Sequence, residues 1–129
     1  MFFWIISAIA VYFIHLFLPS LIRIPQIGVT RYVGSRDDLP ELPIVGQRAS
    51  RAFNNLQESM PIFLALAVTN LLIDPNVLGD AILGAQLFVF ARIFYLGFYL
   101  AAVPWGRSMV WATGFLGLLF MLKPIVLQI

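Results

Sequence analysis

Four long apolar segments dominate this sequence, and they constrain its fold more than any other feature. A helix needs about 20 mostly apolar residues to cross the hydrocarbon core of a bilayer. The segments reach this length at about residues 2–24, 43–73, 77–103 and 108–127, and 61% of the 129 residues are hydrophobic. We therefore expect an all-α integral membrane protein, with one domain over residues 1–129 folded as a bundle of four transmembrane helices.

Prolines, glycines and charges indicate where these helices end. Pro25 predicts the end of the first helix, and the polar residues 26–42 predict a surface loop. The "DPN" stretch at residues 74–76 predicts a turn, and "VPWGRS" predicts a break before the last helix. The first segment lacks a positively charged start, so we expect a retained membrane helix rather than a cleaved signal peptide.

Polar residues form a stripe at the start of the second helix. Its mostly apolar, uncharged part, residues 60–73, is too short to span a bilayer, so the helix must extend backward through the polar residues before it. Arg51, Asn55 and Glu58 are spaced by four and then three positions, which places them on one helix face. Part of this stripe is therefore expected at membrane depth or at the headgroup level.

The third helix carries a second polar stripe. Arg92, Tyr95 and Tyr99 are spaced by three and four positions and share a helix face. Two interpretations remain open. In the first, an arginine of either stripe pairs with Glu58 inside the bundle and the tyrosines anchor the interface. In the second, the stripes form a binding site, because each ionisable residue at membrane depth costs about 2.5–3.5 kcal/mol and usually has a function there.

The positions of the arginines predict an orientation. Six of the eight Lys and Arg residues flank or occupy the first loop or begin the last helix, whereas the loop between the second and third helices is acidic. The positive-inside rule then places loops one and three in the cytoplasm and both termini on the other side of the membrane. The arginines that carry this argument are Arg23, Arg31, Arg36, Arg48, Arg51 and Arg107.

Composition excludes several other functions. The chain has no cysteine, so any thiol chemistry must use a thiol that arrives with a substrate. A formal net charge of +2 is too small to indicate a nucleic-acid partner. His15 lies alone on an apolar helix without a second ligand at metal-binding spacing, so we expect it to have a packing or interfacial role and expect no metal site.

Two motifs resemble those of the MAPEG family, the membrane-associated proteins in eicosanoid and glutathione metabolism. "RAFNNLQESMPIF" is similar to the family's second-helix motif, and "ARIFYLGFY" followed by "VPWGRS" is similar to its third helix and to the arginine that opens its fourth. Length, helix count and loop placement extend the resemblance over nearly the whole chain. The resemblance implies a short, bacterial-type member in an inner membrane, assembled as a homotrimer with sites between subunits.

The resemblance also implies an activity and a site. It implies a membrane-bound glutathione transferase that conjugates glutathione, its co-substrate, to hydrophobic electrophiles from the surrounding lipid, or that reduces lipid hydroperoxides. Arg51, Asn55 and Glu58 match the family's glutathione contacts. Tyr95 and Tyr99 on the third helix match the aromatic or polar positions that face these contacts, and Arg107 matches the arginine at the start of the fourth. The candidate site further includes Arg92, from the polar stripe of the third helix, and Ser108, which follows Arg107.

The arginine at the start of the fourth helix would supply the chemistry. Arg107 matches the arginine that stabilises the glutathione thiolate, and a nearby guanidinium lowers the pKa of a thiol because it favours the charged form. Ser108 either donates a hydrogen bond to the sulfur or caps the helix, and the sequence leaves both roles open.

Two other functions compete with this one. The first is a non-catalytic lipid-binding or scaffold protein of the same fold. The second is a small proton-coupled multidrug-type transporter with Glu58 as its proton carrier, which the neighbouring Arg51 disfavours. Binding of glutathione to the purified protein would separate the transferase from both.

Overall fold

A computed structural model describes residues 1–35, 37–73 and 78–128. This part of the chain contains four long helices and one short one. The long helices are α1 (Phe2–Ile27), α3 (Ile44–Ile73), α4 (Leu78–Leu100) and α5 (Pro104–Val126), and the short one is α2 (Val29–Val33). Each long helix is long and apolar enough to cross a membrane. The all-α, four-helix fold expected from the sequence is confirmed.

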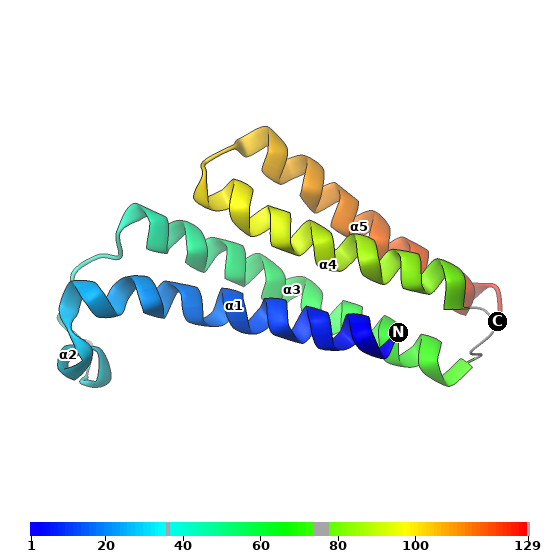
Figure 1. Ribbon diagram of the computed structural model, residues 1–129, viewed down its shortest axis with the longest axis horizontal. Coiled ribbons are helices and arrows are strands. Elements are labelled where there is room, and N and C mark those ends of the chain that lie inside the picture. Colours follow the sequence, from blue (N-terminus) through cyan, green and yellow to red (C-terminus); the bar gives the residue numbers. More distant parts are fainter. Residues whose placement is uncertain (36, 74–77, 129) are drawn as a thin grey trace.

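The helices run up and down as two antiparallel pairs (Figure 1). α1 lies beside α3, and α4 and α5 form the most extensive contact between any two helices. Figure 1 shows α2 at the same end of the bundle as the turn between α4 and α5, whereas the N-terminus and the C-terminal end of α5 lie at the opposite end. The first loop and the start of α5 therefore share one end of the molecule, as the orientation argument requires.

Prolines end the helices less sharply than expected. α1 continues through Pro25 to Ile27, so its predicted end at residue 24 is wrong. Proline removes one backbone donor without forbidding the helical conformation of the residues that follow, and transmembrane helices tolerate this. The stop comes at Gly28, whose N–H donates to the Ile24 carbonyl at 2.8 Å and whose φ of 80° favours glycine.

Other boundaries also differ from those expected. The predicted loop at residues 26–42 contains α2, α4 ends at Leu100 rather than at residue 103, and α5 begins at Pro104 rather than at residue 108. Proline suits the first helical position, because the N–H that it lacks has no partner there. The predicted turn at residues 74–76, the predicted helix start at residue 77 and Arg36 lie outside the described residues.

The α4–α5 pair is close because two glycines face each other. A Cβ atom built on Gly117 would lie 2.6 Å from the Gly84 carbonyl oxygen and 2.9 Å from the Phe88 backbone nitrogen. Small residues are enriched where transmembrane helices approach this closely, because the helix backbones themselves come into contact. The two helices are thus fixed in register, and this register determines which α4 and α5 side chains face α3.

A compact apolar core joins the two helix pairs. Phe63 of α3 and Phe88 of α4 are fully buried and stack at 4.6 Å between ring centroids with planes 13° apart. Leu56 and Met121 are also fully buried in this core. Outside it, large apolar side chains are exposed on every long helix, which suits a surface in contact with lipid.

Candidate functional site

Arg92 of α4 is the most deeply buried of the charged side chains that the sequence singles out. It is 3% exposed, and its Nη1 donates to the Asn55 Oδ1 of α3 at 2.8 Å. Its guanidinium carbon also lies 4.9 Å from the centre of the Phe88 ring and 5.8 Å from that of Tyr95. The Nε atom is buried and has no hydrogen-bond partner in the described part of the chain. Arg92 therefore links the two predicted stripes and keeps an unused donor.

The predicted pairing of an arginine with Glu58 is not observed. Arg92 bonds Asn55, and Arg51 donates to the Gln47 Oε1 at 3.3 Å on its own helix. Among residues 1–35, 37–73 and 78–128, the structure has one ion pair, and it lies elsewhere, between Lys123 and Asp80. The carboxylate of Glu58 is exposed on the surface of α3. Structural pairing within one chain thus does not account for this residue.

Aromatic and basic side chains meet where α4 ends and α5 begins. The rings of Tyr95 and Tyr99 are in edge contact at 5.5 Å between centroids, with Tyr95 buried and Tyr99 half-buried. The guanidinium carbon of Arg107 lies 4.9 Å from the centre of the Tyr99 ring. Such a cation–π contact holds a guanidinium over one face of a ring. It therefore fixes the position of Arg107 beside the two phenols.

Ser108 occupies a different place from the one that a capping role requires. The residue before the first turn of α5 is Val103, and no side chain in the described part of the chain caps this helix. The hydroxyl of Ser108 instead donates to the Pro104 carbonyl at 3.1 Å within the helix. The capping interpretation is therefore wrong. A hydrogen bond from Ser108 to a sulfur atom would require the hydroxyl to rotate away from Pro104.

All eight predicted site residues line one run of three hollows between α3, α4 and α5. The basic hollow, of about 200 Å³, is lined by Arg48, Arg51, Phe98, Tyr99, Ala102, Val103, Pro104 and Arg107. The polar hollow, of about 320 Å³, is lined by Asn55, Tyr95, Tyr99, Arg107, Ser108 and Trp111. The apolar hollow, of about 440 Å³, is lined by Asn55, Glu58, Ser59, Ile62, Leu66, Arg92, Trp111, Phe115, Leu118, Leu119 and Leu122.

Neighbouring hollows share lining residues, so polarity changes gradually along the run. Tyr99 and Arg107 line both the basic and the polar hollow, while Asn55 and Trp111 line both the polar and the apolar one. A molecule with charged ends could therefore occupy the first two hollows while an apolar molecule occupies the third. The structure brings the eight residues together, and their part in binding or catalysis stays a prediction.

Sequence reasoning missed the apolar half of this run. Trp111 follows Arg107 by four positions and Phe115 follows Trp111 by four, so helical spacing from the predicted arginine would have found both. Their rings stack at 5.8 Å with planes 4° apart. Arg48 was also missed as a lining residue, and its Nη1 donates to the Leu100 carbonyl at 3.2 Å. No spacing within one helix predicts that contact, because it depends on how α3 and α4 pack.

His15 lies apart from the three hollows, inside the bundle. It is 1% exposed, and its Nδ1 is 2.8 Å from the Val11 carbonyl oxygen, to which it donates in the tautomer protonated at that nitrogen. Its Nε2 is buried and has no hydrogen-bond partner among the described residues. The location agrees with the packing role expected for this side chain.

The fold and the hollows define a class of protein: a multi-pass helical membrane protein with a charged and aromatic site at one end of its bundle. A family model described as the MAPEG family matches residues 1–126. The chain therefore belongs to the MAPEG family, which includes glutathione transferases and related proteins. Comparisons with curated proteins and with solved structures gave no match. Family membership and the four apolar helices together establish an integral, multi-pass membrane protein.

Proposed function

We propose that this protein is a glutathione transferase that conjugates glutathione to hydrophobic electrophiles dissolved in the membrane. The observation that carries the proposal is the run of three hollows, because it joins a basic end to an apolar end. Glutathione has two carboxylates, one ammonium group and a thiol, whereas its acceptor is apolar. A site for both therefore needs this change of polarity along its length.

The charges of the site suit glutathione. Arg51 is exposed in the basic hollow and would bind a ligand carboxylate. Glu58 has no partner among the described residues and would bind the ligand ammonium. Asn55 already accepts a hydrogen bond from Arg92, so its own amide N–H groups remain to donate to the peptide carbonyls of glutathione.

Arg107 would activate the thiol. The Tyr99 ring holds its guanidinium beside the polar hollow, and the first turn of α5 adds the positive end of a helix dipole there. Both favour a thiolate, which is the nucleophile. The sulfur would attack a carbon of the acceptor, a sulfur–carbon bond would form, and the leaving group would depart with its electron pair. The thiol proton would have passed to water.

We propose further that the active assembly is a homotrimer with sites between subunits. Arg51, Asn54, Gln57 and Glu58 are exposed on α3, and a polar helix face is costly beside lipid. A neighbouring subunit would cover this face. Native mass spectrometry from detergent should show mainly trimer, and mainly monomer or dimer would contradict the assembly.

The proposed orientation has its own test. α2, which contains Arg31, and the start of α5, which contains Arg107, lie at one end of the bundle (Figure 1), and the positive-inside rule assigns that end to the cytoplasm. A reporter fused to the C-terminal end should then behave as non-cytoplasmic. A cytoplasmic reporter would overturn the orientation and leave the site chemistry unaffected.

A glutathione titration of the purified protein tests the binding site. Glu58→Gln and Arg51→Ala should each weaken binding, because loss of one partner of a desolvated charge pair costs about 2–5 kcal/mol. Arg31→Ala is the matched control, since Arg31 is exposed on α2 and lines none of the three hollows. Wild-type affinity in both site variants would overturn the proposed site.

Ultraviolet difference spectroscopy tests the chemistry. Arg107→Leu should retain glutathione binding but lose thiolate absorbance at neutral pH, together with most turnover of a reactive aryl halide. Arg31→Leu again controls for the loss of one positive charge. An unchanged thiolate signal would remove Arg107 from the mechanism. Glutathione-saturated wild type without any thiolate signal would instead favour a non-catalytic binding protein, and failure to bind glutathione at all would favour the lipid-binding protein or the transporter.

A further inference from the structure

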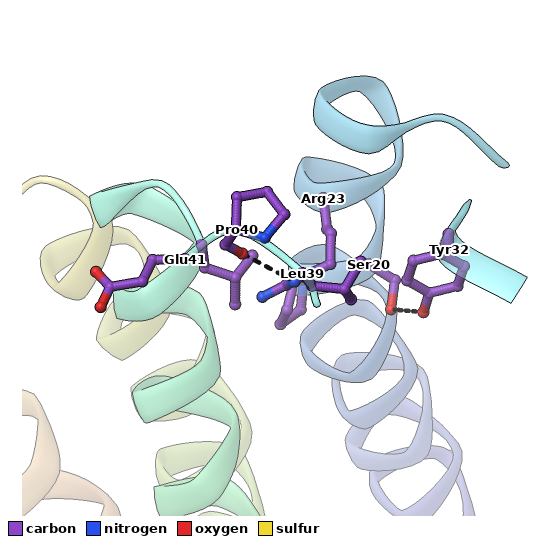
Figure 2. A pocket seen from close by; sticks show the side chains of 8 residues that line it. Ser20, Arg23, Tyr32, Leu39, Pro40 and Glu41 are labelled. Carbon is purple, nitrogen blue, oxygen red and sulfur yellow. Dashed lines mark hydrogen bonds between the residues drawn. The ribbon is translucent and has the colours of Figure 1, made fainter. Parts of the chain in front are cut away.

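A cavity of about 510 Å³ lies away from the three hollows, between the last turns of α1, the short helix α2 and the chain that leads into α3 (Figure 2). Its lining includes Ser20 and Arg23 of α1, Tyr32 of α2, and Pro40 and Glu41 of the following loop. None of them lines the basic, polar or apolar hollow. The cavity is therefore separate from the proposed glutathione site.

Hydrogen-bond donors converge on this cavity. Arg23 donates from Nη1 to the Pro40 carbonyl at 3.3 Å, and its other N–H groups have no partner in the described part of the chain. The Ser20 Oγ accepts a hydrogen bond from the Tyr32 hydroxyl at 2.7 Å and keeps its own proton to donate. Figure 2 shows the Glu41 carboxylate turned away from Arg23. A guanidinium and a hydroxyl side by side form the kind of site that binds a phosphate.

The depth of the cavity in the membrane can be worked out from α1. The middle of α1, which spans Phe2–Ile27, lies between Ile14 and His15. Arg23 follows this point by eight to nine positions, or about 13 Å along a helix, and half of the roughly 30 Å hydrocarbon core is about 15 Å. With the middle of the helix at the middle of the bilayer, Arg23 therefore lies at the edge of the hydrocarbon core, from which its long side chain reaches the lipid headgroups.

An apolar track leads from the cavity into the membrane. Phe13 and Phe17 are 50% and 55% exposed, and their rings stack at 6.1 Å between centroids. Phe13, Phe17 and Ser20 are spaced by four and three positions and so share a helix face. A molecule bound at Ser20 and Arg23 would therefore lay an apolar tail along the two rings. Free phosphate would gain nothing from this track.

We propose that this cavity binds the phosphate group of an anionic phospholipid, whose acyl chain lies along Phe17 and Phe13. The lipid belongs to the leaflet at the arginine-rich end of the bundle. α2 lies at the rim, where its exposed Val29 and Val33 suit the boundary between headgroups and acyl chains. An anionic headgroup is preferred to a zwitterionic one, because the positive charge of Arg23 would repel a headgroup ammonium.

Native mass spectrometry of the full chain in detergent tests the preference for an anionic lipid. The probes are phosphatidylglycerol and phosphatidylcholine with identical acyl chains. Wild type should bind phosphatidylglycerol at least tenfold more tightly, and Arg23→Gln should remove about tenfold of that affinity. Arg31→Gln is the matched control, because it removes the same charge from an arginine that does not line the cavity. It should change the affinity by less than about twofold.

Four results would overturn the proposal. Equal affinity of wild type for the two lipids would remove the anionic preference. An equal loss in Arg23→Gln and Arg31→Gln would show a diffuse charge effect rather than a site. Displacement of phosphatidylglycerol by millimolar inorganic phosphate would show an anion site that does not recognise lipid. Glutathione should displace none of the bound lipid, and displacement would mean that the two sites are one.

Discussion

Replacing Asn55 with alanine should destabilise the protein by leaving a buried charge without its partner. The Asn55 Oδ1 accepts the hydrogen bond from Arg92 Nη1, and Arg92 is 3% exposed with its Nε already unpaired. A hydrogen bond to a charged group contributes about 1.5–3 kcal/mol to stability, and a buried charged group that loses its partner keeps its full desolvation penalty. We therefore expect Asn55→Ala to lower the free energy of unfolding by about 2–3 kcal/mol.

Removing the arginine itself should have a smaller effect. Arg92→Leu loses the same hydrogen bond and the contact with the Phe88 ring, together about 2–4 kcal/mol. It also relieves the cost of a charged side chain at membrane depth, about 2.5–3.5 kcal/mol on insertion scales. The two changes nearly cancel, so the stability of Arg92→Leu should stay within about 1 kcal/mol of wild type. Arg92→Leu, which removes the charge altogether, is thus expected to destabilise the protein less than Asn55→Ala does.

Unfolding by a denaturing detergent, followed by tryptophan fluorescence, measures these differences. Thr69→Ala is the control for the change in helix propensity, because the Thr69 hydroxyl donates to the Ala65 carbonyl of the same helix at 2.8 Å and Thr69 is not among the residues assigned to the subunit contact. It should shift the free energy of unfolding by less than about 0.5 kcal/mol. If Arg92→Leu proves more destabilising than Asn55→Ala, then the guanidinium is better stabilised than its contacts indicate, and the reasoning fails.

Three further substitutions follow from the backbone. Gly84→Ala should lower the free energy of unfolding by about 1–3 kcal/mol or more, because the new Cβ would meet the Gly117 carbonyl. Gly97→Ala should leave it unchanged or raise it by up to about 1 kcal/mol, because nothing lies within 4 Å of the new Cβ. Equal effects of the two substitutions in detergent unfolding would contradict the close contact at Gly84. Ala102→Gly should stabilise the protein by about 1 kcal/mol, since the φ of 59° at Ala102 strains the backbone of an alanine but is adopted freely by glycine. An unchanged or lower midpoint of detergent unfolding would contradict this strain.

Helical spacing predicted which residues of this site share a face but not which residues touch. Residues 51–58 are helical as expected, because four- and three-residue steps identify a face whatever surrounds it. The contact between Arg92 and Asn55 could not be predicted in this way. It depends on how far α3 and α4 are shifted along each other's axes, and the sequence of either helix alone does not determine this shift. The sequence offered Glu58 as an equally plausible partner for the arginines.

The predictions of the helix boundaries were wrong for a related reason. Pro25 and Pro104 were both taken as breaks, yet one lies inside α1 and the other begins α5. Proline restricts its own φ and removes a donor, and both effects are compatible with a first turn or with a helix end near water. The positive φ at Gly28 and at Ala102 ends the preceding helices, and Ala102 carries no sequence signal for it.

Polar links between α3 and the α4–α5 pair occur along the whole length of their contact. Arg48 reaches the Leu100 carbonyl near one end, Asn55 meets Arg92 farther along, and the buried Asn70 donates to the Met121 carbonyl at 2.8 Å near the other end. Lipid provides no hydrophobic force to press helices together, so specific contacts must do so. α4 and α5 are in close backbone contact through Gly84 and form one tightly packed pair. Any sliding or rolling of α3 against that pair would break several of these links at once, so we expect the hollows between them to resist changes of shape.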